Sequence, residues 1–472
     1  QNNVWHGVCR SKTESLLKGK NMRCMKFIFV WVILAARSGW SQEVITISTE
    51  DTLTLDRCIE IALKNQPALG AAQGAIITAE SDYTQVRSLR FPQIQMEAGA
   101  YVTNTPLGSS NAIAQAPVIE PKNNTDFIPT IRLTVKQPIY DFGRTDKSLE
   151  SKSKLIRAAE MSLQATEDDV ILNVHTSYYN YVLAQQILKI NEERVTQSRK
   201  HLERARGFFA VGKIPESEVY KAELEVSNAE LELTNARGKL QLAKVSLNSA
   251  MGVADWTDDV TSYKVASHEN YVAFNANLRE SINSAFTGRR EVAASEMRVQ
   301  AWRSALSAAK SQYYPIITAS GGFGPYIVRN TLTTGETKDK FKIGYNIGVN
   351  FEFPIFQGLN VRADISEAQG GIRIASSQYN TTKQRIAQEV QERYYSVKFA
   401  EERYKSTERI VTQTERNLNL AEGRFDTGVG SAIEVTDANF SVANARIERT
   451  TALYNYKIEL ARFQRTIGTL RK

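Results

Sequence analysis

Residues capable of catalysis or metal binding are sparse in this chain of 472 residues. Its four histidines, at positions 6, 175, 201 and 268, do not have the spacing of metal ligands. Only Cys58 lies beyond the first 41 residues, so no disulfide is expected within the remainder of the chain. The sequence contains no nucleophile paired with a base, no phosphate-binding loop and no aromatic-basic stripe. We therefore expect a protein that is not an enzyme and binds neither cofactor nor nucleic acid.

Glycines and acidic residues gather instead at two similar turns. The first reads GFFAVGKIPESE and the second GRFDTGVGSAIE, and they lie 216 residues apart. The residues of interest are Gly212, Lys213 and Glu218 in the first, and Gly428, Gly430, Glu434 and Asp437 in the second. Gly212 and Gly428 are typical of residues that end a helix in the left-handed conformation.

The acidic residues have a local interpretation as well as a functional one. Ser431 and Glu434 form an S-x-x-E capping box, which predicts a helix start. Pro215 suits the first turn of the corresponding helix. Asp437 lies one turn further along, where capping explains less, and we favour a role facing a pore. For Glu218 both interpretations stay open.

Very long helices are expected to position these turns. No proline occurs between Pro138 and Pro215, or anywhere after Pro354. Apolar residues recur every seven positions, at Val174, Tyr181, Leu188, Val195, Leu202 and Phe209. After the first turn a line of alanines accompanies the heptad, at Ala222, Ala229, Ala236, Ala243 and Ala250. Such patterns predict closely packed, supercoiled helices.

The chain consists of two copies of one pattern. RSLRFPQI matches KSQYYPII at an offset of 223, while TVKQPIYDFGR matches NFEFPIFQGLN at an offset of 216. HTSYYNYVLAQQ and QERYYSVKFAEE keep the offset of 216, as do the two turns. Each copy is therefore predicted to run helix, hairpin, very long helix, turn, helix.

The prediction divides the chain into four parts. Residues 1–41 are upstream sequence and a signal peptide, and residues 255–276 are a linker. The first repeat, 42–254, has helices at about 55–90, 143–211 and 215–251 and strands at about 93–103 and 127–137. The second repeat, 277–472, has helices at about 278–313, 358–426 and 431–468 and strands at about 316–324 and 343–353.

The first 41 residues hold most of the charge imbalance. They carry seven Lys or Arg and one Glu, so the rest of the chain has only +2 of the total net charge of +8. From Met25 a lysine precedes a short apolar run, and Gly39 and Ser41 supply small residues for cleavage, as in a secretory signal. The run is shorter than the roughly 20 residues of a membrane-spanning helix. Residues 1–24 are interpreted as sequence upstream of the true start.

The predicted strands alternate apolar and polar residues, most clearly in YNIGVNFEF. Segments of about ten residues with this period suit a strand that crosses a bilayer, although a soluble half-buried sheet has the same pattern. An export signal without a spanning helix favours the membrane interpretation. A sheet in hydrocarbon must have no free edge, and four strands are too few to close. Two copies of the chain would supply eight strands and three copies twelve.

These features together resemble the outer-membrane efflux proteins of the TolC family. The resemblance runs from about Leu53 to Leu470 and rests on LTLDRCIEIALKNQPAL, the two strand exits at Pro138 and Pro354, and the GFFAVG and GRFDTG turns. It implies an α-helical tunnel joined to a transmembrane β-barrel. The assembly would be a homotrimer with a 12-strand barrel in the outer membrane and a 12-helix coiled-coil tunnel in the periplasm. It also implies a periplasmic adaptor (membrane fusion) protein and an inner-membrane transporter as partners.

The resemblance also gives the two turns a role. They would be periplasmic tips, with Glu218, Glu434 and Asp437 at the pore entrance and Gly212, Lys213, Gly428 and Gly430 in contact with the adaptor. Three copies of Asp437 around a narrow axis would attract cations. Gly430 departs from well-known members, which have at this position a basic residue that helps to lock the closed state.

Two functions from different classes are compatible with these patterns. One is a passive exit duct of an efflux or type I secretion system, and the other is an exported structural or adhesive coiled-coil rod. The four strand segments favour the duct, because a rod does not need them. The cargo of such a duct, whether drug, metal ion, siderophore or polypeptide, is set by the pump.

Overall fold

The computed structural model describes residues 52–106, 123–253, 264–266, 270–331 and 337–471. The chain divides into two compact units, Gln1–Ile45 and Thr46–Lys472. The described residues all belong to the second unit. The expected upstream segment and signal peptide lie outside the described residues, as does part of the expected linker.

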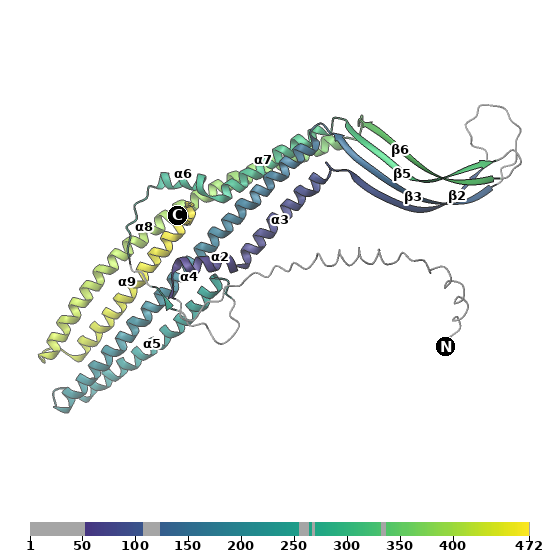
Figure 1. The fold of residues 1–472 in the computed structure, drawn as a ribbon. Helices are drawn as coiled ribbons and strands as arrows, with labels where there is room; N and C mark the ends of the chain where they lie inside the picture. The colour runs from purple at the N-terminus through teal and green to yellow at the C-terminus, as the bar shows by residue number, and fades with distance from the viewer. Residues whose placement is uncertain (1–51, 107–122, 254–263, 267–269, 332–336, 472) are drawn as a thin grey trace, which may run out of the picture. The chain divides into compact units, whose positions relative to one another are not determined.

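Four long helices form the two hairpins that carry the turns (Figure 1). Helices α4 (Arg144–Ala210) and α8 (Asn360–Asp426) each contain 67 residues. Helices α5 (Glu216–Ala250) and α9 (Ala432–Thr466) each contain 35 residues. At 1.5 Å per residue, α4 and α8 are each about 100 Å long. The equal lengths agree with the internal repeat.

The heptad residues pack α4 against α5 and α8 against α9, and α4 also contacts α9. Val174, Tyr181 and Val195 are buried on α4, and Ala222, Ala229 and Ala236 are buried on α5. Small residues on one helix let the other approach closely. The prediction was wrong for Phe209, whose side chain is 43% exposed. The helix ends beside it, and the neighbouring Phe208 makes the packing contact instead.

Two shorter helices precede the long ones in each repeat. They are α2 (Leu55–Asn65), α3 (Pro67–Ser88), α6 (Leu278–Gly288) and α7 (Arg290–Ser311). The expected single helices at 55–90 and 278–313 are therefore each divided. Gln66 and Arg289 are extended at the two breaks, with ψ of 119° and 126°. Pro67 accounts for the first break, because the residue before a proline disfavours the helical conformation.

The second break has no proline and depends on tertiary contacts. The Arg289 side chain is buried and pairs with both Glu291 and Glu389. Gly288 lies against the backbone of Ile467, so close that a Cβ would approach Ile467 O to 3.0 Å. No short-range pattern in the sequence indicates this arrangement.

The strands form one antiparallel sheet in the order β2-β3-β5-β6 (Figure 1). They are β2 (Gln93–Pro106), β3 (Asn123–Tyr140), β5 (Ile316–Thr331) and β6 (Thr337–Glu352). Each extends beyond its expected range toward the connection between the two strands of its hairpin. A second, parallel pair, β1 (Thr52–Leu53) with β4 (Lys264–Val265), was not anticipated.

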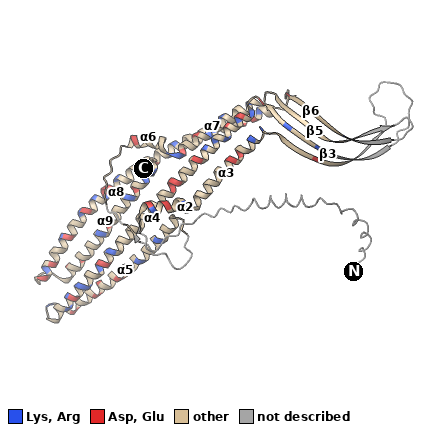
Figure 2. Ribbon diagram, viewed as in Figure 1, with Lys and Arg blue, Asp and Glu red and all other residues tan. Residues whose placement is uncertain are grey.

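The four-stranded sheet has two free edges among the described residues, since β2 pairs only with β3 and β6 only with β5. One face carries exposed apolar side chains, among them Met96, Tyr345, Ile347 and Phe351. Figure 2 shows that Lys, Arg, Asp and Glu are frequent along the helices and scarce on the described parts of the strands. A sheet with an exposed apolar face and unpaired edges requires further partners.

No helix in the described ranges has the length and apolar content that a membrane span requires.

Candidate functional site

The candidate site is the pair of tip turns, which we define as residues 211–215 between α4 and α5 and residues 427–431 between α8 and α9. Gly212 and Gly428 have φ of 74° and 77°. The Gly212 amide donates to Phe209 O at 2.9 Å, and the next amide, Lys213 N–H, donates to Phe208 O at 2.9 Å. The same two bonds recur at Gly428, from its own amide to Phe425 O and from Val429 to Arg424 O, both at 3.0 Å. These are Schellman motifs, as the glycines predicted.

Gly430 is held tightly against the end of α8. Its amide donates to Arg424 O at 2.8 Å. A Cβ at this position would approach Arg424 Cβ to 2.9 Å and Phe425 N to 3.0 Å. A basic side chain here would therefore displace the turn.

Lys213 is exposed, with its Nζ 5.3 Å from the centre of the Phe208 ring. The contact is a cation–π interaction worth about 0.5–1 kcal/mol at an exposed site. It leaves the ammonium group accessible at the tip.

Glu434 takes part in the expected helix cap and in an ion pair across the turn. Its amide donates to Ser431 Oγ at 3.4 Å, so the expected cap is present. Its carboxylate accepts from Arg424 Nε at 3.2 Å across the turn, and both side chains are partly exposed. An exposed pair of this kind contributes little stability, in the range of about 0–1 kcal/mol. The carboxylate thus remains close to solvent.

Glu218 and Asp437 have different surroundings. Glu218 Oε1 accepts from Lys221 Nζ at 2.8 Å, while its Oε2 is buried without a hydrogen-bond partner in the described structure. Asp437 is exposed, and its carboxylate pairs with no described residue. Within the residues that the structure describes, no group of three His, Cys, Asp or Glu could hold a metal ion. Among the described residues, Glu218 and Glu434 thus each pair with a cation of their own, Lys221 and Arg424.

The two tips touch through side chains of the helices that flank the turns. The rings of Phe208 and Phe425 lie 5.3 Å apart, and Phe425 belongs to a buried cluster with Val435 and Ala438. Arg204 on α4 reaches two carboxylates of α8, Glu422 at 3.5 Å and Asp426 at 3.9 Å. Phe425 continues an apolar heptad of α8 that includes Val411 and Leu418, whereas the ion pairs have no local signal in the sequence.

His201 is buried between the hairpins, with only 2% of its surface exposed. Its Nε2 lies 3.5 Å from Thr436 Oγ1 on α9, and its Nδ1 has no partner in the described structure. Burial and the Arg204 charge lower the pKa of His201, opposed by Glu422 and Glu218. The imidazole is therefore neutral at neutral pH, and it acts as a packing residue.

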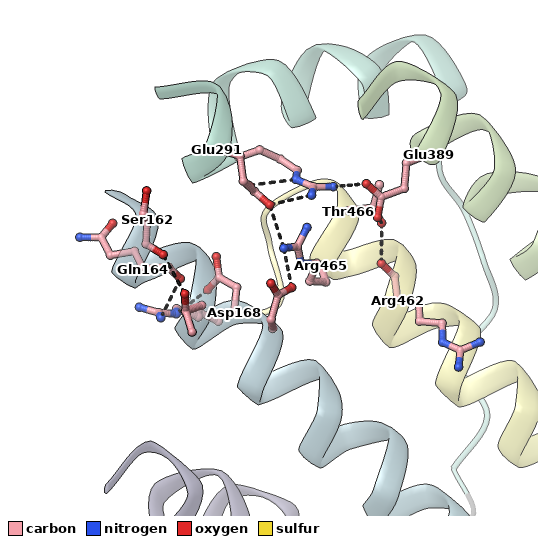
Figure 3. Close-up of polar contacts among 12 residues, drawn as sticks. Ser162, Gln164, Asp168, Glu291, Glu389, Arg462, Arg465 and Thr466 are labelled. Carbon is pink, nitrogen blue, oxygen red and sulfur yellow. Dashed lines mark hydrogen bonds and ion pairs between the residues drawn. The ribbon is translucent and has the colours of Figure 1, made fainter. Parts of the chain in front are cut away.

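A second polar cluster lies where the end of α9 meets α4, α7 and α8 (Figure 3). Arg289 donates to Glu291 at 2.8 Å and to Glu389 at 2.7 Å. Arg465 reaches Glu291 at 2.8 Å and Asp169 at 2.5 Å. Arg471 pairs with Asp168 at 2.7 Å and also with Glu167. The cluster fixes the C-terminal end of the chain to α4 and α7.

Glu291 is the centre of this cluster. Burial acts to raise its pKa, but the hydrogen bond from Arg289 and the charges of Arg465 and Arg289 outweigh it and lower the pKa to about 2. In the first repeat Ala68 stands at the position equivalent to Glu291. Gln66, the equivalent of Arg289, donates to the carbonyls of Ser249 and Ala250 at 2.8 and 2.9 Å. The two repeats thus close the same junction with different chemistry.

Comparison with known proteins places this arrangement in a family. The sequence profile described as "outer membrane efflux protein" matches residues 58–253 and 281–469. The chain belongs to the outer membrane efflux protein family. The two matched segments correspond to the two repeats read from the sequence. As a member of this family, the chain is a transport protein of the outer membrane and an efflux channel component.

Individual relatives are distant in sequence. Outer membrane protein TolC of Vibrio cholerae is 24% identical over 414 residues, 87% of this chain and 89% of the relative. TolC of Escherichia coli is 22% identical over 348 residues, 72% of this chain and 69% of the relative. The structure of the Campylobacter jejuni CmeC outer membrane channel superposes with a TM-score of 0.70 at 18% identity, covering 88% of this chain and 86% of that one. The helical tunnel fold expected from the sequence is confirmed.

Proposed function

We propose that three copies of the chain form a passive exit duct across the outer membrane and the periplasm. Their sheets would close into a twelve-stranded barrel, and their hairpins would form a tunnel of twelve helices. The duct would serve an efflux or type I secretion system, in which a periplasmic adaptor and an inner-membrane transporter supply cargo and energy. The protein itself would carry out no catalysis and use no cofactor.

The free edges of the sheet are the observation that carries this proposal. In lipid every backbone polar group needs an internal partner, so an open four-stranded sheet is not viable there. In the described part of the chain, the outermost strands β2 and β6 both have an unpaired side. Pairing β6 of one copy with β2 of the next extends the sheet until the ring closes, a head-to-tail contact that is compatible with threefold symmetry.

The helices also have unpartnered apolar surfaces. Along α5, Leu224, Leu231, Leu242 and Val245 are between 59% and 70% exposed. On α8, Phe399 and Leu420 are 66% and 69% exposed. Surfaces of this kind on a soluble segment mark contacts with other proteins. We infer that α5 of one copy packs on α8 of the next.

At the tips, six turns would surround the entrance to the duct. Gly212, Lys213, Gly428 and Gly430 would contact the adaptor, and the exposed Lys213 ammonium and the rigid glycine turns suit a docking surface. Glu218, Glu434 and Asp437 would line the entrance. Of the three, Asp437 is exposed and pairs with no described side chain, so it has the most freedom to face a pore.

An exported coiled-coil rod is the weaker alternative. A rod needs no four-stranded sheet with an exposed apolar face, and the outer membrane efflux protein family is a family of channels. Mass measurement of detergent-extracted protein from the outer-membrane fraction tests the assembly directly. We expect three chains per particle that dissociate only on heating, and a monomer or a detergent-independent fibre would contradict the duct.

The role of Asp437 is tested by single-channel recording in planar bilayers. We expect multivalent cations added on the periplasmic side to block the conductance of the native channel. The Asp437→Ala variant should lose most of this block, because three carboxylates disappear from the entrance. Glu448→Ala, an exposed substitution further along α9, should leave the block unchanged. Block that survives Asp437→Ala at full strength would exclude the proposed position of this residue.

A further inference from the structure

The internal repeat can be followed strand by strand in the structure. An offset of 223 relates β5 to β2, and an offset of 216 relates β6 to β3, as the prolines before and after the hairpins indicate. In the first hairpin Gln93 lies opposite Lys136, and in the second Ile316 lies opposite Glu352. These two pairs are related by the same two offsets. The hairpins therefore have equivalent registers, and the offsets hold at single-residue accuracy.

The two hairpins meet within the chain at one seam, between β3 and β5. Leu133 lies opposite Phe323, Val135 opposite Gly321 and Lys136 opposite Ser320, before a register shift at Tyr140. This seam joins the last strand of the first repeat to the first strand of the second. The two free edges of the described sheet are the strands that this seam does not use. They are the last strand of the second repeat (β6) and the first strand of the first repeat (β2).

We propose that β6 of one copy pairs with β2 of the next in the register of this internal seam. Applying the two offsets places Phe351 opposite the partner subunit's Ala98 and Val349 opposite the partner subunit's Ala100. Glu352 would then lie opposite the partner subunit's Glu97. This inference rests on the proposed ring of copies and adds the residue pairs that join its members.

The alternation of side chains agrees with this register. Val349 and Phe351 lie on the exposed apolar face, as do Ile94 and Met96 of β2, and Ala98 and Ala100 continue that face at the same alternation. Asn350 and Gly99 would meet on the opposite face. A slip by one residue would bring an apolar side chain of one strand beside a polar position of the other, since successive residues face opposite sides of a sheet.

Like the strand edges, one short helix lacks a contact that its equivalent in the other repeat makes. Helix α7 packs against both α4 and α8, whereas its repeat equivalent α3 has an extensive contact only with α4. Eight residues of α7 are buried, while on α3 the one buried residue is Leu69. The equivalent of the α4–α7 contact is a contact between α8 and the partner subunit's α3, which would bury the exposed Ile77.

The long helices show the same relation. On α9, Tyr454, Ile458 and Ala461 are buried, and the Tyr454 ring lies 6.4 Å from Tyr179 on α4. Their equivalents on α5 at the offset of 216 are Gly238, Leu242 and Val245, and the latter two are 70% and 59% exposed. The face of α5 that is exposed in one chain is thus the face that its repeat equivalent buries. The sheet, the short helices and the long helices thus each indicate the same contact between neighbouring copies of the chain.

Disulfide trapping tests the register in the intact protein. Residues directly opposite each other on antiparallel strands have Cβ atoms about 4.5–5.5 Å apart, within reach of a disulfide after small adjustments. We expect Phe351→Cys with Ala98→Cys to give covalent dimers and trimers on oxidation in the outer membrane, seen after heating without reductant. Cys58 will not interfere, because it is fully buried and burial raises the pKa of its thiol to about 12.

Three further variants make the outcomes distinct. Val135→Cys with Gly321→Cys is the matched pair within one chain and should form an intrachain disulfide. Phe351→Cys paired with Met96→Cys or with Ala100→Cys reports a slip of two residues and should remain uncrosslinked. Crosslinking of either of these in place of the Ala98 pair would overturn the register while leaving the ring of copies intact. A monomer in which only the intrachain control forms would overturn both.

Discussion

At the scale of single residues, the passage from strand to helix is marked by unusual backbone conformations. Phe142 and Leu359 are the two non-glycine residues with positive φ in the described structure, at 54° and 71°. The backbone strain at Phe142 is offset by aromatic contacts, because its ring stacks on Tyr314 at 5.4 Å and meets Tyr140 edge-on at 4.7 Å. Leu359 is 65% exposed and has no comparable packing. It occupies the N-cap position of α8, where the chain enters that helix.

Leu359→Gly is therefore predicted to stabilise the fold. A left-handed conformation costs a non-glycine residue about 1–2 kcal/mol, and glycine loses about 0.5–1 kcal/mol through its greater freedom when unfolded. The expected net gain is about 0.5–1 kcal/mol, measurable by chemical unfolding of the detergent-solubilised protein. Phe142→Gly is the control and should destabilise, because it removes the aromatic contacts. A clear loss of stability in Leu359→Gly would contradict the strain argument.

At the scale of elements, the two repeats show how one junction is built in two ways. Gly252 and Gly468 end their helices with φ of 70° and 76°, and each presses against the backbone of a helix break. A Cβ would approach Asn65 C to 2.8 Å in the first junction and Gly288 C to 2.9 Å in the second. The first junction is completed by the neutral amide of Gln66 and the second by the charges around Glu291. The second junction is therefore the one that acid should weaken.

Glu291→Gln is predicted to lower stability at neutral pH and to reduce acid sensitivity. The folded pKa of about 2 lies below the ordinary value near 4.3, so the ionised group stabilises the fold above about pH 4.3. This contribution is lost as the pH falls toward 2, and a shift of about two units corresponds to roughly 3 kcal/mol. Unfolding midpoints measured from pH 7 to pH 2 check both effects. Glu296→Gln, on the exposed side of the same helix, should retain the native profile. An unchanged profile in Glu291→Gln would remove Glu291 from this role.

At the scale of the whole molecule, one chain leaves its surfaces incomplete. Among the residues that the structure describes, the strand edges, the exposed side of α3 and the apolar stripe on α5 all lack partners within one chain. These surfaces belong to different elements and have equivalents that are buried in the other repeat. A chain of this design gains stability from association that its own core does not supply.

Leu231→Lys on the α5 stripe is predicted to weaken the trimer without unfolding the hairpin. Leu231 is 59% exposed in the single chain, so the lysine displaces no packing there. In the assembly it would place a charge in an apolar contact and reduce the heat-stable fraction of trimer several-fold. Quantitative gel analysis of unheated samples measures this fraction. The neighbouring Glu232→Lys, on the exposed side of α5, should leave it unchanged, and equal effects of the two would argue against the stripe as an interface.

The sequence alone was sufficient for the features that local interactions control. Heptads and the absence of proline predicted the long helices, and glycines at two positions predicted their left-handed ends. The S-x-x-E pattern predicted the cap of α9, and dyad alternation located the strands. Each of these signals arises within a few residues, where the period of the backbone imposes a pattern on the side chains. The similarity between segments 216 or 223 residues apart also predicted the internal repeat.

Only the tertiary structure decided which distant residues meet. The break at Arg289 depends on two carboxylates, one of them 100 residues away on α8, and the tip contact of Arg204 depends on side chains of the other hairpin. Phe209 continued the heptad but is exposed, because the helix ends where the pattern would have continued. Pairings of this kind depend on how elements approach in space, and no local periodicity encodes them. For the same reason, the role of Glu218, Glu434 and Asp437 at a pore entrance stays a prediction, because it depends on how copies of the chain are arranged.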